Sequence, residues 1–174
     1  DDIHLLIGYE SGNVELYDTD TYERKRDLLS SLDDPILNTH WIGQFIVTGT
    51  QNGMVCIHDV SKKQHLVDKV NMRQQFNLED YVFVSGVCMS EDCTTVVIGM
   101  SNGCTYFYKF DLTEQKLLYS FKDILCKSED FSMIKAIEFN HIHSNIVATG
   151  NFNKNNGLIK IYDTNKKLLI KKIE

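Results

Sequence analysis

Residues 45–59 read FIVTGTQNGMVCIHD: an apolar run, a glycine, a short polar turn that ends in glycine, and a second apolar run closed by histidine and aspartate. The same pattern recurs as LLIGYESGNVELYD (5–18), VVIGMSNGCTYFYK (96–109) and IVATGNFNKNNGLIKIYD (146–163). The first glycines of the four segments are 41, 50 and 51 residues apart. Self-similarity at such spacing is the sequence signature of a repeat architecture.

Each segment has the chemistry of a β-hairpin. Its apolar runs are short and rich in β-branched residues, which suits strands that are buried on both faces. Its turns, such as Gln51-Asn52-Gly53, place glycine where the backbone needs a positive φ. No stretch shows a sustained helical period, and the chain has 1 proline, so we predict an all-β fold. The structural turn glycines of the pattern are Gly8, Gly12, Gly49, Gly53, Gly99, Gly103, Gly150 and Gly157.

Further strands are predicted on both sides of the hairpins. Upstream strands are expected at residues 36–41, 82–89 and 134–139. Downstream strands are expected at residues 25–30, 64–70, 116–121 and 167–173. Every repeat therefore has four antiparallel strands, except the first, which starts at its second strand.

A repeat of this length, with four strands and a terminal aromatic–aspartate pair, resembles the WD-repeat family, whose units are the blades of a β-propeller. The resemblance covers nearly the whole chain, although its motifs are degenerate. The terminal pair stands as Tyr17-Asp18, His58-Asp59, Tyr108-Lys109 and Tyr162-Asp163. The family's Gly-His before each first strand is missing, and Asn or Ser replaces the Asp of the tight turn. The resemblance implies a propeller that lacks the usual His–Asp hydrogen bonds.

The domain prediction is a single partial propeller over residues 1–174, with blades at about 1–32, 33–72, 80–123 and 132–174. Propellers close with about 4–8 blades, and closure protects the blade edges. We therefore expect the chain to belong to a larger ring. The other blades would come from the same polypeptide, a partner chain or a second copy, and the isolated segment is expected to self-associate or aggregate.

Composition excludes several classes of protein. The formal net charge of −6 argues against a general nucleic-acid binder, because phosphate contacts need a basic surface. The distribution is uneven: residues 1–35 carry ten acids against three bases, and residues 154–174 carry six lysines against two acids. The 5 cysteines form no CxxC pair, and the sequence has no Asn-x-Ser/Thr sequon. We predict an intracellular protein, cytoplasmic or nuclear, without a membrane span.

No catalytic, metal or cofactor site is predicted. His141 and His143 form the closest histidine pair, but only asparagines stand near them as further ligands, so a solvated turn is expected. No serine lies in a nucleophile elbow, and each glycine pair belongs to a hairpin turn. The aromatic run Tyr106, Phe107, Tyr108 and Phe110 is expected to pack between blades rather than to stack on bases.

Candidate binding residues come from loops that vary between repeats. The loops at 71–81, 123–132 and 151–157 are predicted to lie on one rim and to mix aromatic with charged side chains. Such residues on the loops of a rigid scaffold favour an interface with a partner protein. The candidates are Arg73, Phe76, Tyr81, Lys127, Phe131 and Phe152. The alternative for Phe76 and Phe131 is that they plug the end of the propeller.

The predicted function is a non-catalytic WD-repeat scaffold or adaptor that holds other protein subunits in a larger intracellular complex. The alternative is a propeller that contacts nucleic acid through its lysine-rich last blade. Residues 6–18, LIGYESGNVELYD, also resemble a hairpin of G-protein β-subunit-like proteins. That resemblance implies an adaptor tied to the assembly of large kinase complexes.

Overall fold

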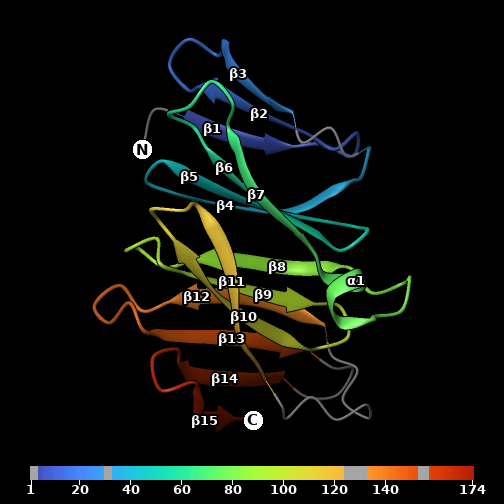
Figure 1. The fold of residues 1–174 in the computed structure, drawn as a ribbon, viewed down its shortest axis with the longest axis vertical. Helices are drawn as coiled ribbons and strands as arrows, with labels where there is room; N and C mark the ends of the chain where they lie inside the picture. The colour runs from blue at the N-terminus through green and yellow to red at the C-terminus, as the bar shows by residue number, and fades with distance from the viewer. Residues whose placement is uncertain (1–3, 30–32, 124–132, 153–156) are drawn as a thin grey trace.

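The protein is a stack of antiparallel β-sheets that follow one another along the chain (Figure 1). The computed structural model describes residues 4–29, 33–123, 133–152 and 157–174. Within them lie one three-stranded and three four-stranded sheets, each with its strands in sequence order. The predicted all-β fold with WD-type blades is confirmed.

The strands correspond closely to the sequence pattern. The first sheet contains β1 (His4–Gly8), β2 (Asn13–Asp18) and β3 (Arg24–Leu29). The second contains β4 (Ile36–Ile42), β5 (Phe45–Thr50), β6 (Met54–Asp59) and β7 (Leu66–Asn71). The third contains β8 (Val84–Met89), β9 (Thr95–Met100), β10 (Thr105–Asp111) and β11 (Lys116–Lys122). The fourth contains β12 (Ile134–Phe139), β13 (Ile146–Phe152), β14 (Gly157–Asp163) and β15 (Leu168–Ile173).

A β-bulge recurs at the same position of every repeat. The pairing with the outer strand shifts register at Leu16/Tyr17, Ile57/His58, Phe107/Tyr108 and Ile161/Tyr162. The second residue of each pair is the aromatic or histidine that precedes the charged end of the motif. Bulges are designed features of a sheet rather than defects. Their recurrence shows that the four degenerate repeats are structurally equivalent.

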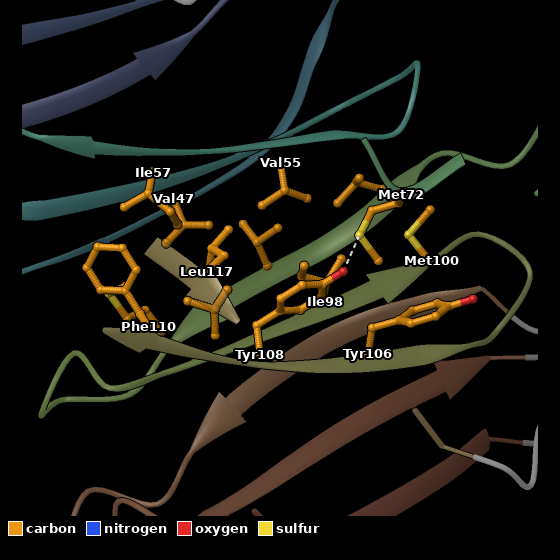
Figure 2. Close-up of a cluster of buried hydrophobic side chains, with 14 of the residues drawn as sticks. Val47, Val55, Ile57, Met72, Ile98, Met100, Tyr106, Tyr108, Phe110 and Leu117 are labelled. Atoms are coloured by element: carbon orange, nitrogen blue, oxygen red, sulfur yellow. Dashed lines mark hydrogen bonds between the residues drawn. The ribbon is translucent and has the colours of Figure 1, made fainter. Parts of the chain in front are cut away.

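Alternation along the strands gives the second and third sheets two buried faces, and β5 and β9 are buried along their whole length. Val47 and Ile57 of the second sheet pack on Tyr108 of the third, in the largest hydrophobic cluster (Figure 2). Phe107, one residue before Tyr108, faces the fourth sheet and lies against Tyr162, with ring centroids 5.1 Å apart. The aromatic run of β10 is therefore buried between blades, as its sequence predicts.

Two groups of glycines have different roles. Gly12, Gly53 and Gly103 end the tight turns with φ of 84°, 83° and 81°. The other group lies in strands and consists of Gly8, Gly49, Gly99, Gly150 and Gly157. The sequence-based prediction that these five glycines lie in turns is therefore wrong. A Cβ on Gly49 would lie 2.4 Å from Cγ1 of Val84 in the next sheet. The missing side chain lets the following blade approach closely.

One short helix, α1 (Met72–Phe76), stands in the connection between the second and third sheets, where the sequence predicts only a loop. Asn71 caps its start, since its Oδ1 accepts from the backbone N–H of Gln74 at 3.1 Å. Asn77 ends it with φ of 49°, in the left-handed region that asparagine tolerates. Five residues are too few for a hydrophobic period to show. No helix among the described residues has the length and hydropathy to cross a membrane.

The outward faces of the first and fourth sheets carry exposed apolar side chains. Leu5 on β1 is 52% exposed, and Ile159 on β14 is 46% exposed. Each points away from the neighbouring sheet, because Leu6 and Tyr162 fill the inward faces. That further blades cover these two faces in a larger ring stays a prediction.

Candidate protein-interaction face

Loop 71–81, one of the loops predicted to bind partners, lies on a side of the stack that we call the α1 rim: α1, the tight turns at 10–12, 51–53 and 101–103, and the described connections beside them (Figure 1). The connection before β4 is fastened there, because the Asp34 carboxylate accepts from the backbone N–H of Asn52 at 3.0 Å. Loop 71–81 is fully described. Lys127 and Phe131 lie outside the described residues, and Phe152 is described only as backbone in β13.

Arg73 holds the rim together from within. Its Nε donates to the carbonyl of Val82 at 2.7 Å, and its Nη2 donates to the carbonyl of Gln51 at 2.8 Å. A third bond runs from Nη1 to Oδ1 of Asn52 at 3.2 Å. The guanidinium thus ties the tight turn of the second blade to the start of the third. Three of its five N–H donors serve the fold, and a contact of Arg73 with a partner stays a prediction.

Phe76 packs inward as well. Its ring centroid lies 4.3 Å from that of Tyr106 and 5.2 Å from that of Tyr119, and the side chain is partly buried against the largest cluster. Beside it, Met72 is fully buried and the Tyr108 hydroxyl donates to Oε1 of Gln75 at 2.7 Å. This geometry agrees with the alternative interpretation, in which Phe76 closes the end of the propeller.

We expect Phe76→Ala to lower the free energy of unfolding by about 2 kcal/mol, since truncating a fully buried phenylalanine costs about 3–5 kcal/mol and this ring is partly buried. Urea unfolding measures the change. Tyr81→Ala in the same loop is the matched control and should change stability by less than about 0.5 kcal/mol. Equal losses in the two variants would contradict the packing role of Phe76.

Among the predicted contact residues whose side chains the structure describes, Tyr81 is the one that remains open to solvent. Its side chain is 70% exposed, and the preceding Glu79 and Asp80 are also exposed. The backbone beneath it is anchored, because Val82 donates its N–H to the carbonyl of Glu79 at 2.9 Å and its carbonyl accepts from Arg73. An exposed aromatic ring beside two carboxylates, on a fastened loop, has the character of an interface residue.

The opposite rim is organised by the aspartates that end the motif. Oδ1 of Asp18 accepts from the backbone N–H groups of Asp20 and Thr21, both at 2.9 Å. Oδ1 of Asp163 accepts from Asn165 and Lys166, both at 3.0 Å. The bond from the Lys166 backbone is the main cause that holds the pKa of Asp163 below its usual range. The terminal aspartate therefore closes the turn into the outer strand.

In the third blade this role belongs to Asp111, which the sequence reading missed. Its Oδ1 accepts from Thr113 at 2.8 Å and from Glu114 at 3.0 Å. Lys109, which the motif placed at this end, instead donates from Nζ to Oγ1 of Thr95 at 2.8 Å. The strand β10 pairs with β11 as far as Asp111, beyond Lys109, so the turn begins later. The signal was present in the sequence as Phe110-Asp111.

A buried ion pair joins the last two blades. Nζ of Lys160 on β14 lies 2.7 Å from Oδ2 of Asp123, and the same oxygen accepts from the Tyr162 hydroxyl at 2.7 Å. Lys160 and Asp123 are each 5% exposed. Burial and the nearby carboxylate raise the pKa of Tyr162, so its hydroxyl keeps its proton and donates. In the sequence, Lys160 is one of the six lysines of residues 154–174, and nothing in the pattern marks it as buried.

The described residues that were considered as metal ligands do not form a cluster. Nδ1 of His141 lies 3.0 Å from Oε1 of Glu91 on the exposed surface. Across the described ranges, no group of three or more His, Cys, Asp or Glu side chains could hold a metal ion. Cys56, Cys88 and Cys104 are buried thiols. That the chain is non-catalytic and binds no cofactor stays a prediction.

Comparison with known proteins identifies the fold to which this geometry belongs. No family model matches the chain. A stretch of 67 residues, 38% of the chain, is 40% identical to the APC/C activator protein CDC20 of Saccharomyces cerevisiae and spans 11% of that protein. A solved structure of the mitotic checkpoint complex contains a chain that superposes on 98% of this one with a TM-score of 0.79 and 16% identity. The chain is built of WD-repeat β-propeller blades. It spans about half of that similar chain, 47% of its length.

Two other solved structures agree with this WD-repeat fold. The Cps50 (Swd1) β-propeller domain of Myceliophteria thermophila matches 99% of the WD-repeat chain with a TM-score of 0.61 and 11% identity, over 70% of its own length. The Raptor protein of Chaetomium thermophilum matches 99% with a TM-score of 0.72 and 13% identity, over 15% of its own length. At these identities the likeness is one of fold.

Proposed function

We propose that this WD-repeat chain is a non-catalytic scaffold that binds protein partners inside a multi-protein assembly. The observation that carries the proposal is the 40% identity to an APC/C activator over 67 residues, joined to the fold of a chain in the mitotic checkpoint complex. A role as an activator-type subunit of a multi-protein assembly is the finer form of the proposal. The implied link to kinase assemblies stays a prediction.

The exposed Tyr81 and its two acidic neighbours are the proposed contact on the α1 rim. A tyrosine supplies a large contact area with little conformational entropy to lose, and such residues dominate binding energy at interfaces. Glu79 and Asp80 complement a basic partner. We therefore expect the partner surface to combine an apolar pocket with lysine or arginine side chains.

The test begins with proteins that co-purify with the full chain, of which the most abundant is then purified and titrated. Tyr81→Ala is expected to weaken binding at least about tenfold, or about 1.4 kcal/mol. Tyr22→Asn is the control: Tyr22 is 84% exposed on the opposite rim, and asparagine tolerates its φ of 57°. Equal affinity of wild type and Tyr81→Ala would place the partner elsewhere on the propeller.

The alternative, a nucleic-acid contact through the last blade, is weakened at three of the six lysines in residues 154–174, because these three have acidic partners. Lys160 is buried against Asp123, and Nζ of Lys166 lies 3.7 Å from Oδ2 of Asp163. Nζ of Lys172 lies 2.8 Å from Oε1 of Glu174. Phosphate binding releases counterions and weakens steeply with salt. Filter binding over a salt series would reveal such a contact.

A further inference from the structure

A cavity of about 410 Å³ opens between the first and second blades on the rim opposite α1. Its volume lies within the range of about 300–1,000 Å³ typical of ligand sites. We call it the Trp41 cavity, after the chain's 1 tryptophan. It is lined by His4, Leu16, Lys25, Arg26, Trp41, Gly43, Gln44 and Val60.

The walls of the Trp41 cavity are held in place from both blades. The Trp41 indole N–H donates to the carbonyl of Gly43 at 2.9 Å, which fixes the ring at the mouth of the turn. Arg26 reaches from β3 of the first blade and donates to the carbonyls of Val60 and Lys62 in the second. A wall that is ordered before binding lowers the entropy cost of taking a ligand.

The lining of the Trp41 cavity is cationic and apolar. Lys25 and Arg26 are the basic residues of the lining, and none of the lining side chains that the structure describes is a carboxylate, although the chain as a whole has a net charge of −6. Three carbonyls accept from the Arg26 guanidinium, which has five N–H donors, so donors remain for a ligand. Leu16, Val60 and the Trp41 ring provide apolar surface beside these charges.

The partners of Lys25 can be exchanged. Its Nζ lies 3.5 Å from Oδ2 of Asp18 and 3.6 Å from Oε2 of Glu23, and its side chain is 43% exposed. Ion pairs exposed in this way contribute about 0–1 kcal/mol, so a ligand carboxylate that also reaches Arg26 can displace them. The same two acids repel the successive phosphates of a nucleic acid. The charges therefore favour a short ligand whose carboxylates are few and are separated by neutral residues.

We propose that the Trp41 cavity binds an acidic peptide segment of a partner protein, with an apolar side chain against Trp41 and an adjacent carboxylate at Lys25 and Arg26. The proposal rests on the scaffold function above and gives it a second contact, on the rim opposite Tyr81. A short peptide segment matches the site, because it can present one acidic and one apolar side chain to the charged and apolar residues that line the same cavity.

Trp41 provides the test, since it is the 1 tryptophan of the sequence and lines the cavity, and its indole is excited selectively at wavelengths longer than those that the 8 tyrosines absorb. The probe is the capped peptide Gly-Ser-Glu-Leu-Glu-Ser-Gly, which lacks tryptophan and tyrosine. We expect a saturable change in emission with Kd on the order of 1 mM, the weak affinity of a small contact. A peptide with lysine in place of both glutamates should bind at least about tenfold more weakly, and decathymidylate should cause no saturable change.

Lys25→Glu is expected to weaken binding of the acidic peptide at least about tenfold, because it removes one cation and places a carboxylate at the site. Lys166→Glu is the matched control: this lysine also lies beside the turn aspartate of its blade and is 74% exposed, but it is remote from the cavity. Unchanged emission, equal binding of the lysine peptide, tighter binding of decathymidylate or equal affinity in Lys25→Glu would each overturn the proposal. The partner titration with Tyr81→Ala tests the scaffold function separately, since it uses the other rim.

Discussion

Lys160→Ala is expected to lower the free energy of unfolding by about 3–5 kcal/mol, because it leaves the buried Asp123 carboxylate without its cation. The two charged atoms lie 2.7 Å apart, and their side chains are 6% and 3% exposed. The same carboxylate oxygen also accepts from the Tyr162 hydroxyl, which is a neutral donor. For a domain of ordinary stability, about 5–15 kcal/mol, this loss is large. Urea unfolding followed by circular dichroism measures it.

Two further variants separate burial from charge. Lys166→Ala breaks a pair with Asp163 whose lysine is 74% exposed, so it should cost less than about 1 kcal/mol. Lys160→Met combined with Asp123→Leu should cost less than Lys160→Ala alone, since an apolar pair leaves no buried charge. Equal costs for Lys160→Ala and Lys166→Ala would show that the carboxylate of Asp123 is hydrated in the folded protein.

Acid is expected to destabilise the fold through His58, by about 3 kcal/mol between pH 6.5 and pH 4. The His58 side chain is buried, with none of its surface exposed, and burial lowers its pKa from 6.5 to about 4, with the nearby His65 adding to the effect. In this window the unfolded state binds a proton at His58 and the folded state does not. Stability from this residue is therefore full above pH 6.5 and declines as the pH falls toward 4.

Urea unfolding at pH 7, 5.5 and 4 measures this dependence. His58→Gln cannot titrate and should flatten the profile, although His40, whose pKa burial also lowers, keeps part of the slope. His143→Gln removes an exposed histidine and should leave the profile as in the wild type. A slope that is the same in His58→Gln and in the wild type would show that His58 is protonated within the fold.

Strand order and turn geometry follow from local chemistry, and for this reason the sequence is sufficient to predict the repeats. A β-branched run followed by Asn-Gly forms a hairpin whatever surrounds it, because the glycine takes the positive φ that the turn needs. Gly53 and Gly103 do so with φ of 83° and 81°. The sequence predicted the candidate site less well than the strands. Among its predicted residues with described side chains, Tyr81 is exposed, whereas Arg73 and Phe76 make contacts within the fold.

The sequence by itself determined the repeat, its strands and the burial of the β10 aromatics, since these depend on neighbours a few residues away. Only the tertiary structure decided which polar residues are buried and which loops are free. Lys160 meets a carboxylate 37 residues earlier, and Arg26 meets carbonyls 34 to 37 residues later, across the boundary between two sheets. The direction of such a side chain is set by the sheet stacked against it. The sequence of a strand therefore does not indicate whether a charged side chain is solvated or lies buried against another blade.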